Sequence, residues 1–188
     1  MLSDVLKNSQ FFFQLYNIDR QNAEKCKEKR CPYCGGPLHY ANYARKPRGE
    51  LVDLPEEYCI KFSLCCGRDG CRHRTTPPSC RFMDRKVYWY CAILIIMTLR
   101  YNGASIYSLC KKFKISNKTI NRWITFFQTI FPSLPQWQRI RGLIPSSVKN
   151  SELPVGLVNY FIKVKKSVEE SLKSCLEFLS QGQSALEK

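Results

Sequence analysis

The chain has 188 residues, of which 44% are hydrophobic and 13% aromatic, a composition that supports a packed core and excludes a disordered tail. Its 30 lysine and arginine residues outnumber the 15 aspartate and glutamate residues, and the formal net charge of +15 favours nucleic acid as a partner ahead of an anionic membrane surface. Eleven cysteines without an export signal make a disulfide framework the weaker interpretation and favour reduced thiols and a metal.

The first predicted element covers residues 1–29, where apolar and charged residues recur at helical spacing. This segment contains several acidic residues and lacks an apolar run that ends in a small-residue cleavage site, so it does not resemble a signal peptide. We therefore expect an N-terminal helix and a cytoplasmic protein.

Residues 30–82 predict a small β module, because they are rich in Gly, Pro, Cys and Tyr and contain short alternating runs. In the run EYCIKFSL, four apolar residues fall on one side of a predicted strand: Tyr58, Ile60, Phe62 and Leu64. The module also holds a set of candidate metal ligands: Cys31, Cys34, Cys65, Cys66, Cys71 and His73.

The cysteine spacing in this module predicts a zinc ribbon, since CPYCGG supplies one pair of thiols and CCGRDGC supplies the second. Structural Zn²⁺ takes four Cys, or Cys with His, in a closed tetrahedral shell. We assign the ligands as Cys31, Cys34, Cys66 and Cys71. Cys65 stays open as the alternative to Cys66, although strand alternation places it on the opposite face. A closed shell leaves no position for a catalytic water, which argues against catalysis at the metal.

The stretch RHRTTPPSCRFMDRK joins the predicted ribbon to the helices and carries five basic residues: Arg72, Arg74, Arg81, Arg85 and Lys86. Pro77 and Pro78 stiffen it, so it is either an extended arm that follows a phosphate backbone or a plain linker with solvated charges. In the first case we expect Arg72, Arg74 and Arg81 to contact DNA phosphates.

Residues 83–131 predict a helical domain. It opens with the apolar run VYWYCAILIIMTL, which is shorter than the roughly 20 residues of a membrane-spanning helix and indicates a buried core helix. In LCKKFKISNKTINRW, apolar residues occupy the positions that a helix-turn-helix buries: Leu109, Phe113, Ile115, Ile120 and Trp123. Lys114 stands where glycine is frequent at the start of the turn.

The second helix of this motif would present the side chains that read DNA. Ser116 is suited to cap it, and Asn and Arg on its outward face can pair with adenine and guanine in the major groove. The expected base contacts are Ser116, Asn117, Lys118, Asn121 and Arg122. We expect phosphate contacts from Lys111 and Lys112 on the preceding helix. An amphipathic helical hairpin without DNA contacts is the alternative interpretation.

The last segment, residues 132–188, is divided by prolines at 132, 135, 145 and 154 into short pieces before a final predicted helix near Val164 to Leu179. That helix could serve dimerisation.

The order of CPYCGG, CCGRDGCRHRTT and LCKKFKISNKTINRW resembles the zinc-ribbon and helix-turn-helix DNA-binding modules of bacterial insertion elements and their transposases. The resemblance covers about residues 31–131 and implies a bacterial or mobile-element origin, double-stranded DNA as partner, nucleoid association and the four zinc ligands named above. The sequence departs from such ribbons in placing four residues between Cys66 and Cys71, where two are frequent. A transposase nuclease core is also not expected, because no acid occurs between Asp84 and Glu152.

Together these features predict an α+β protein in which a zinc ribbon of short antiparallel strands precedes a helix-turn-helix, with Zn²⁺ as cofactor. We expect a non-enzymatic, sequence-specific double-stranded DNA-binding protein, either a transcriptional regulator or a transposition accessory. It would act as a homodimer or within a larger nucleoprotein complex, and not on a membrane. The alternative is a nucleic-acid or protein adapter subunit of such a complex; a metal-assisted nuclease ranks last for want of histidines and clustered acids.

Overall fold

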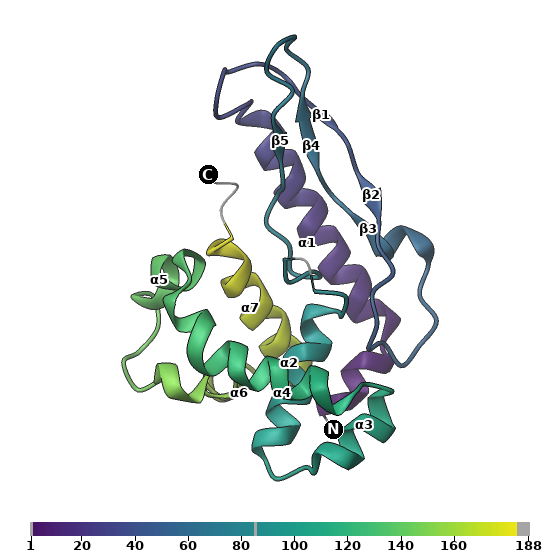
Figure 1. Ribbon diagram of the computed structural model, residues 1–188, viewed down its shortest axis with the longest axis vertical. Helices are drawn as coiled ribbons and strands as arrows, with labels where there is room; N and C mark the ends of the chain where they lie inside the picture. Colours follow the sequence, from purple (N-terminus) through teal and green to yellow (C-terminus); the bar gives the residue numbers. More distant parts are fainter. Residues whose placement is uncertain (1, 85, 184–188) are drawn as a thin grey trace.

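The computed structural model describes residues 2–84 and 86–183 and has a mixed α+β architecture (Figure 1). It begins with a 3-10 turn, η1 (Leu2–Lys7), and the long helix α1 (Ser9–Glu28). Asn8 starts α1, because its side-chain oxygen accepts hydrogen bonds from the amides of Gln10 and Phe11. The predicted N-terminal helix is confirmed.

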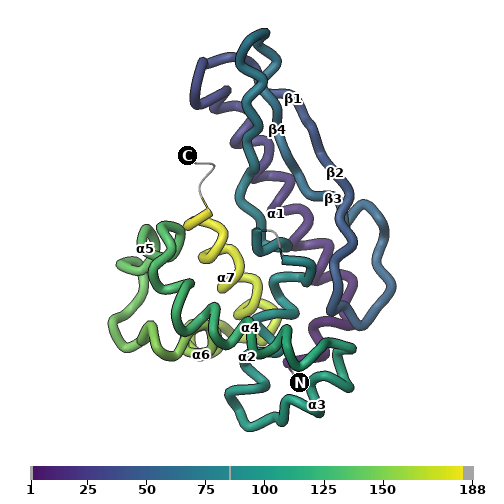
Figure 2. Tube along the Cα trace, viewed as in Figure 1, coloured from purple at the N-terminus to yellow at the C-terminus, as the bar shows by residue number. Residues whose placement is uncertain are grey.

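Two small antiparallel sheets lie along α1, as the chain trace in Figure 2 shows. The three-stranded sheet has the order β1-β4-β5, formed by Leu38–Tyr40, Leu64–Cys66 and Arg74–Thr75. The two-stranded sheet pairs β2 (Tyr43–Ala44) with β3 (Ile60–Lys61). The expected β module therefore contains short antiparallel strands.

The single strand expected over EYCIKFSL is wrong in its extent. Glu56–Cys59 form a 3-10 turn, η2, and the chain then pairs as β3 and, after a break at Phe62 and Ser63, as β4. The break arises because β3 and β4 belong to different sheets, so the chain crosses from one sheet to the other between them. The buried Ser63 amide stays satisfied by donating to the side-chain oxygen of Asn42 at 3.1 Å.

The remaining helices form the wider end of the molecule (Figure 1): α2 (Tyr90–Tyr101), α3 (Ile106–Phe113), α4 (Asn117–Thr125), α5 (Pro135–Arg141), α6 (Val155–Val164) and α7 (Val168–Gln181). Shorter turns connect them: η3 (Phe126–Ile130), η4 (Phe131–Ser133) and η5 (Asn150–Glu152). Helix α2 is buried along its length from Tyr90 to Thr98, as its apolar run predicts. Among residues 2–84 and 86–183, no helix combines the length and the apolar character needed to cross a bilayer.

One apolar core joins these helices to α1. Phe12 of α1 packs edge-on against Trp89 with 5.0 Å between ring centroids, and Trp89 stacks on Phe82 at 5.3 Å. Leu172 and Leu176 of α7 are fully buried in the same core. The apolar face of α7 is thus covered within the chain, and dimerisation through this helix stays a prediction.

The stretch expected to be an extended arm or a solvated linker is neither from Pro77 to Met83. Pro77 and all of residues 79–83 are buried beneath α1 and the core helices. Arg85, one of its basic residues, lies outside the described residues. The chain therefore passes from the sheets to α2 through the interior of the protein.

The side chain of Arg81 has no exposed surface. Its Nε donates to Asp19 Oδ2 at 2.8 Å, and its two terminal nitrogens donate to the main-chain oxygens of Tyr58 and Ile60 at 2.5 and 2.9 Å. A guanidinium with its donors used inside the protein cannot reach a phosphate. The expected phosphate contact of Arg81 is therefore wrong.

Candidate metal centre and nucleic-acid interface

Four cysteine sulfurs meet at the end of the three-stranded sheet. The Sγ atoms of Cys31, Cys34, Cys66 and Cys71 all lie within 4.8 Å of one another, with 3.4 Å between those of Cys34 and Cys66 and 3.8 Å between those of Cys31 and Cys71. Four sulfurs bound at about 2.3 Å to one tetrahedral ion would be separated by about 3.8 Å. The cluster therefore has the dimensions of a four-thiolate metal site.

The first pair of thiols is aimed by the two glycines of CPYCGG. The Gly35 amide donates to the Cys31 oxygen at 2.8 Å, and the Cys31 amide donates to the Gly36 oxygen at 2.9 Å. Gly35 has a φ of +68°, which glycine adopts without steric cost. A Cβ added at Gly36 would lie 3.0 Å from Cys66 Sγ and 3.2 Å from Cys34 Sγ. A side chain at position 36 would therefore crowd two of the four sulfurs.

The second pair of thiols is spanned by a longer turn, which accounts for the four intervening residues. The Cys71 amide donates to the Arg68 oxygen at 3.2 Å, and Gly70 adopts a φ of +80° within the turn. The Arg68 amide lies 3.4 Å from Cys66 Sγ, and its guanidinium donates to the Cys34 oxygen at 2.9 Å. Arg68 thus ties the two halves of the cluster together.

The thiols differ in their ionisation. A hydrogen bond from the Gly36 amide lowers the pKa of the Cys34 thiol to about 6. The Arg68 amide also favours the Cys66 thiolate, but burial and the neighbouring sulfurs outweigh it and raise the pKa of Cys66 to about 12. Thiolates this close repel one another, so all four can ionise together only around a cation. The donor set suits a soft divalent ion such as Zn²⁺.

The geometry distinguishes Cys66 from its neighbour. Cys66 is fully buried in the cluster, whereas Cys65 is only half-buried, and its Sγ lies 3.5 Å from the main-chain oxygen of Arg72. His73, the remaining candidate ligand, also lies outside the cluster, and its ring packs against that of Tyr33. The four sulfurs that meet are those assigned from the spacing.

Helices α3 and α4 are joined by a tight turn at residues 114–116. Lys114 takes the left-handed conformation, with φ 50° and ψ 44°, at the position where we noted that glycine is frequent. The five apolar positions of the predicted motif are all buried, as expected: Leu109, Phe113, Ile115, Ile120 and Trp123. Trp123 packs edge-on against Tyr88 at 5.0 Å, which anchors α4 on the core.

Helix α4 begins at the predicted cap, since the Ser116 hydroxyl accepts a hydrogen bond from the Thr119 amide at 3.2 Å. The side chains expected to read bases are exposed: Asn117, Lys118, Asn121 and Arg122. They share one face of α4, where the Asn121 amide donates to Asn117 Oδ1 at 2.6 Å. The hydroxyl of Ser116 is already occupied by capping.

The residues expected to contact phosphates do not form one surface. Lys111 and Lys112 are exposed on α3 beside α4, and Lys112 donates to Ser3 Oγ at 2.8 Å. Arg72 and Arg74 are also exposed, but they follow the cysteine cluster. In Figure 1 the loops that carry the cysteines are at the top of the view, and α3 and α4 are at the bottom. The structure thus separates the two groups along the long axis.

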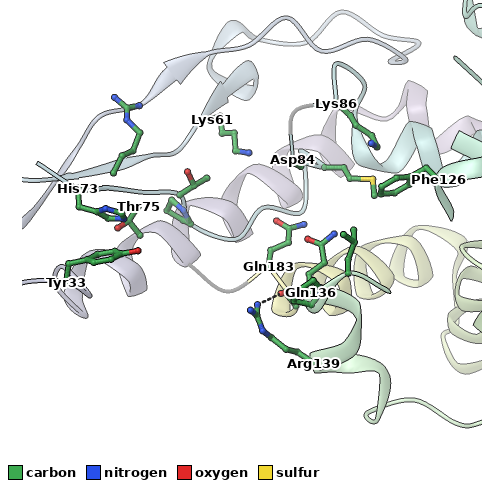
Figure 3. A pocket seen from close by; sticks show the side chains of 17 residues that line it. Tyr33, Lys61, His73, Thr75, Asp84, Lys86, Phe126, Gln136, Arg139 and Gln183 are labelled. Atoms are coloured by element: carbon green, nitrogen blue, oxygen red, sulfur yellow. Dashed lines mark hydrogen bonds between the residues drawn. The ribbon is translucent and has the colours of Figure 1, made fainter. Parts of the chain in front are cut away.

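A basic cleft between the sheets and α5 was not anticipated from the sequence (Figure 3). It is lined by residues from separate segments, including Tyr33, Lys61, Lys86 and Arg139. No motif links them along the chain, and Lys61 lies in a short strand where only apolar residues had been considered. Their shared location is decided by the tertiary structure.

A scan against protein-family models finds no match to the chain, and neither the curated proteins nor the solved structures contain a significant match.

Proposed function

We propose that the chain is a zinc-stabilised, sequence-specific double-stranded DNA-binding protein without catalytic activity, serving as a transcriptional regulator or as an accessory in transposition. The observation that carries this proposal is the pairing of α3 with α4, in which one helix packs on the core through Ile120 and Trp123 while its opposite face exposes polar side chains. That division between a buried and a polar face is what a recognition helix requires.

The exposed face of α4 has the chemistry of base readout. Asn side chains can pair with adenine, and the Arg122 guanidinium can donate two hydrogen bonds to guanine, each good pair contributing about 1–3 kcal/mol of discrimination. Lys111 on α3 is available for a phosphate beside the groove. The net charge of +15 supports the capture of duplex DNA before readout.

Zn²⁺ is the ion we assign to Cys31, Cys34, Cys66 and Cys71. Four thiolates complete its shell, so its part is to hold the two cysteine loops together and not to activate water. The module around the cluster has a small apolar core of its own, formed with Leu38. Its stability would therefore depend on the metal.

Selection from a pool of random duplexes at several salt concentrations, followed by sequencing of the bound fraction, tests the function directly. The wild-type protein should show a steep salt dependence and enrich one motif. Arg122→Ala should lose preference at one or two positions of that motif. Lys149→Ala, which removes an exposed charge outside α3 and α4, should enrich the same motif as the wild type. Failure of the wild-type protein to enrich any motif would refute sequence-specific reading.

The second candidate is an adapter within a larger nucleoprotein complex. It is favoured by the distance between the cysteine loops and α3–α4 in Figure 1, which leaves each end free for a separate partner, and by the 78% exposure of Tyr107 on α3. Under this alternative the protein would bind duplexes without preference and would co-purify with a stoichiometric protein partner.

A further inference from the structure

A cleft of about 720 Å³ separates the sheets from α5 and the end of α7 (Figure 3). Lys61 and residues 73–77 line the side formed by the sheets, and Gln136, Arg139 and Gln183 line the opposite side. Its volume lies within the range of sites that enclose small molecules or single groups of a polymer. The lining residues described by the structure include none from α4.

Positive charge dominates the cleft. The described residues that line it include four cationic side chains, Lys61, Arg74, Lys86 and Arg139, but only one carboxylate, that of Asp84. The Lys86 ammonium is held over the Phe126 ring, 3.9 Å from its centroid, so its position is set before any ligand arrives. The cleft therefore attracts anions.

Lys61 differs from the other cations of the cleft in being buried without a partner among the described residues. Its residue is only 7% exposed, and its ammonium makes no hydrogen bond or ion pair with any described residue. The Lys61 ammonium is not among the fully enclosed polar atoms and faces the cleft, so a largely buried cation without a protein partner in the described part of the chain is available to an anion there. In Figure 3 the Lys61 side chain reaches into the cleft from β3.

The ionisation of the two lysines agrees with this geometry. Burial lowers the pKa of Lys61, and the nearby charge of Arg45 lowers it further. Burial also lowers the pKa of Lys86. Asp84 opposes both effects without cancelling them. A second anion in the cleft would stabilise the charged form of both side chains.

An exposed aromatic ring, that of Tyr33, lines another part of the same cleft. The Tyr33 ring lies 3.8 Å from the ring centroid of His73, tilted by 40°, and Tyr33 is 51% exposed. Nucleic-acid bases stack on exposed aromatic rings of this kind beside a basic groove. A base inside a duplex is already stacked on its neighbours, so only an unpaired base can offer a free face to Tyr33.

We propose that this cleft binds a short unpaired segment of a DNA strand, with phosphates held by Lys61 and Lys86 and a base placed on Tyr33. The proposal goes beyond duplex reading by α4 and does not rest on it, because the two sites use different residues. A single strand would occupy the cleft while α4 remains open to duplex DNA.

The test measures fluorescence anisotropy of a labelled twelve-nucleotide oligo(dT) with the wild-type protein and with Lys61→Gln and Tyr33→Leu. Two controls match these changes outside the cleft: Lys149→Gln removes one exposed charge, and Tyr107→Leu removes one exposed aromatic ring. Zinc content and Tm of each variant show whether the fold is kept. Binding of a duplex is measured on the same preparations, and dTMP and inorganic phosphate serve as competitors.

We expect each cleft variant to weaken oligo(dT) binding by about tenfold, and each control by less than about twofold. Duplex binding should stay unchanged in the cleft variants. Equal binding of oligo(dT) by the wild type and both cleft variants would overturn the proposal. If inorganic phosphate competes as strongly as dTMP and Tyr33→Leu binds as the wild type does, the cleft binds phosphate alone and the assignment of a nucleotide as its ligand is overturned. Equal affinity for dTMP and the oligonucleotide would overturn the assignment of a DNA strand as the ligand. Loss of duplex specificity with these effects intact would remove only the function proposed for α4.

Discussion

The carboxylate of Asp19 on α1 and the guanidinium of Arg81 form an ion pair at 2.8 Å in which the two side chains are 2% and 0% exposed. They are 62 positions apart in the sequence. Asp19 also accepts hydrogen bonds from the Ser79 hydroxyl and the Cys80 amide, both at 2.6 Å. The pair therefore fastens the chain that leaves the sheets to the middle of α1.

Arg81→Ala should lower the free energy of unfolding by about 3–5 kcal/mol, because it leaves the Asp19 carboxylate buried without its cation. Urea denaturation followed by circular dichroism measures this loss. The double variant Asp19→Leu with Arg81→Met should be more stable than Arg81→Ala, since it leaves no buried charge. A double variant no more stable than Arg81→Ala would contradict this account.

Cys34→Ser should abolish stoichiometric zinc binding, because Cys34 is one of the four clustered sulfurs. Cys65→Ser should retain it, because Cys65 lies outside the cluster. Elemental analysis of the purified proteins measures the metal directly. A chelator should lower the Tm of the wild type and leave that of Cys34→Ser almost unchanged. Zinc lost equally from both variants would place Cys65 at the metal.

Gly36→Ala should weaken zinc binding by about tenfold, because its Cβ would lie 3.0 Å from Cys66 Sγ and would displace this sulfur from its place in the cluster. Competition with a chromophoric chelator measures the affinity. Gly142→Ala is the matched control, since a Cβ there meets no atom within 4 Å and its φ is −70°. Equal affinity of Gly36→Ala and the wild type would show that the cysteine loops adjust freely.

Lys114→Gly should raise the free energy of unfolding by about 1 kcal/mol, because glycine adopts the left-handed φ of 50° without steric cost. Lys111→Gly, in the last turn of α3, should lower it by up to about 1 kcal/mol. Both changes remove one lysine charge, so chemical denaturation separates the backbone effect from the charge effect. A loss of stability in Lys114→Gly would mean that the side chain of Lys114 makes an essential contact.

Lys61→Met should stabilise the ligand-free protein by about 1 kcal/mol at neutral pH, because it removes a buried cation while keeping the length of the side chain. The folded-state pKa of Lys61 lies below its ordinary value of 10.5, as a result of burial and of the Arg45 charge, with Asp19 and Asp84 opposing and Arg81 reinforcing the shift. The charged form is thus disfavoured in the folded state. The advantage of Lys61→Met should be largest at neutral pH and decrease as the pH rises from the lowered pKa toward 10.5.

Thermal unfolding of the wild type and Lys61→Met across this pH range gives the comparison, with Lys149→Met as the control for net charge. A destabilised Lys61→Met at every pH would mean that the ammonium contributes to the fold and is not held in reserve for a ligand.

Several features of the site follow from local chemistry and were predictable. The pair of thiols in CPYCGG, the cap formed by Ser116 and the apolar positions from Leu109 to Trp123 depend on residues a few positions apart. The hydroxyl of Ser116 reaches the Thr119 amide whatever surrounds the helix. By contrast, the strand expected over EYCIKFSL was interrupted, because its two halves joined different sheets.

The sequence by itself determined the cysteine loops, the buried helix α2 and the polar face of α4, since each depends on spacing within one segment. Only the tertiary structure decided that Arg81 turns inward to Asp19 and that Lys61, Lys86 and Tyr33 share a cleft. The physical reason is that the surroundings of a charge are set by segments distant in the chain. A basic residue looks the same in the sequence whether its side chain lies in water, beside a carboxylate or in a cleft.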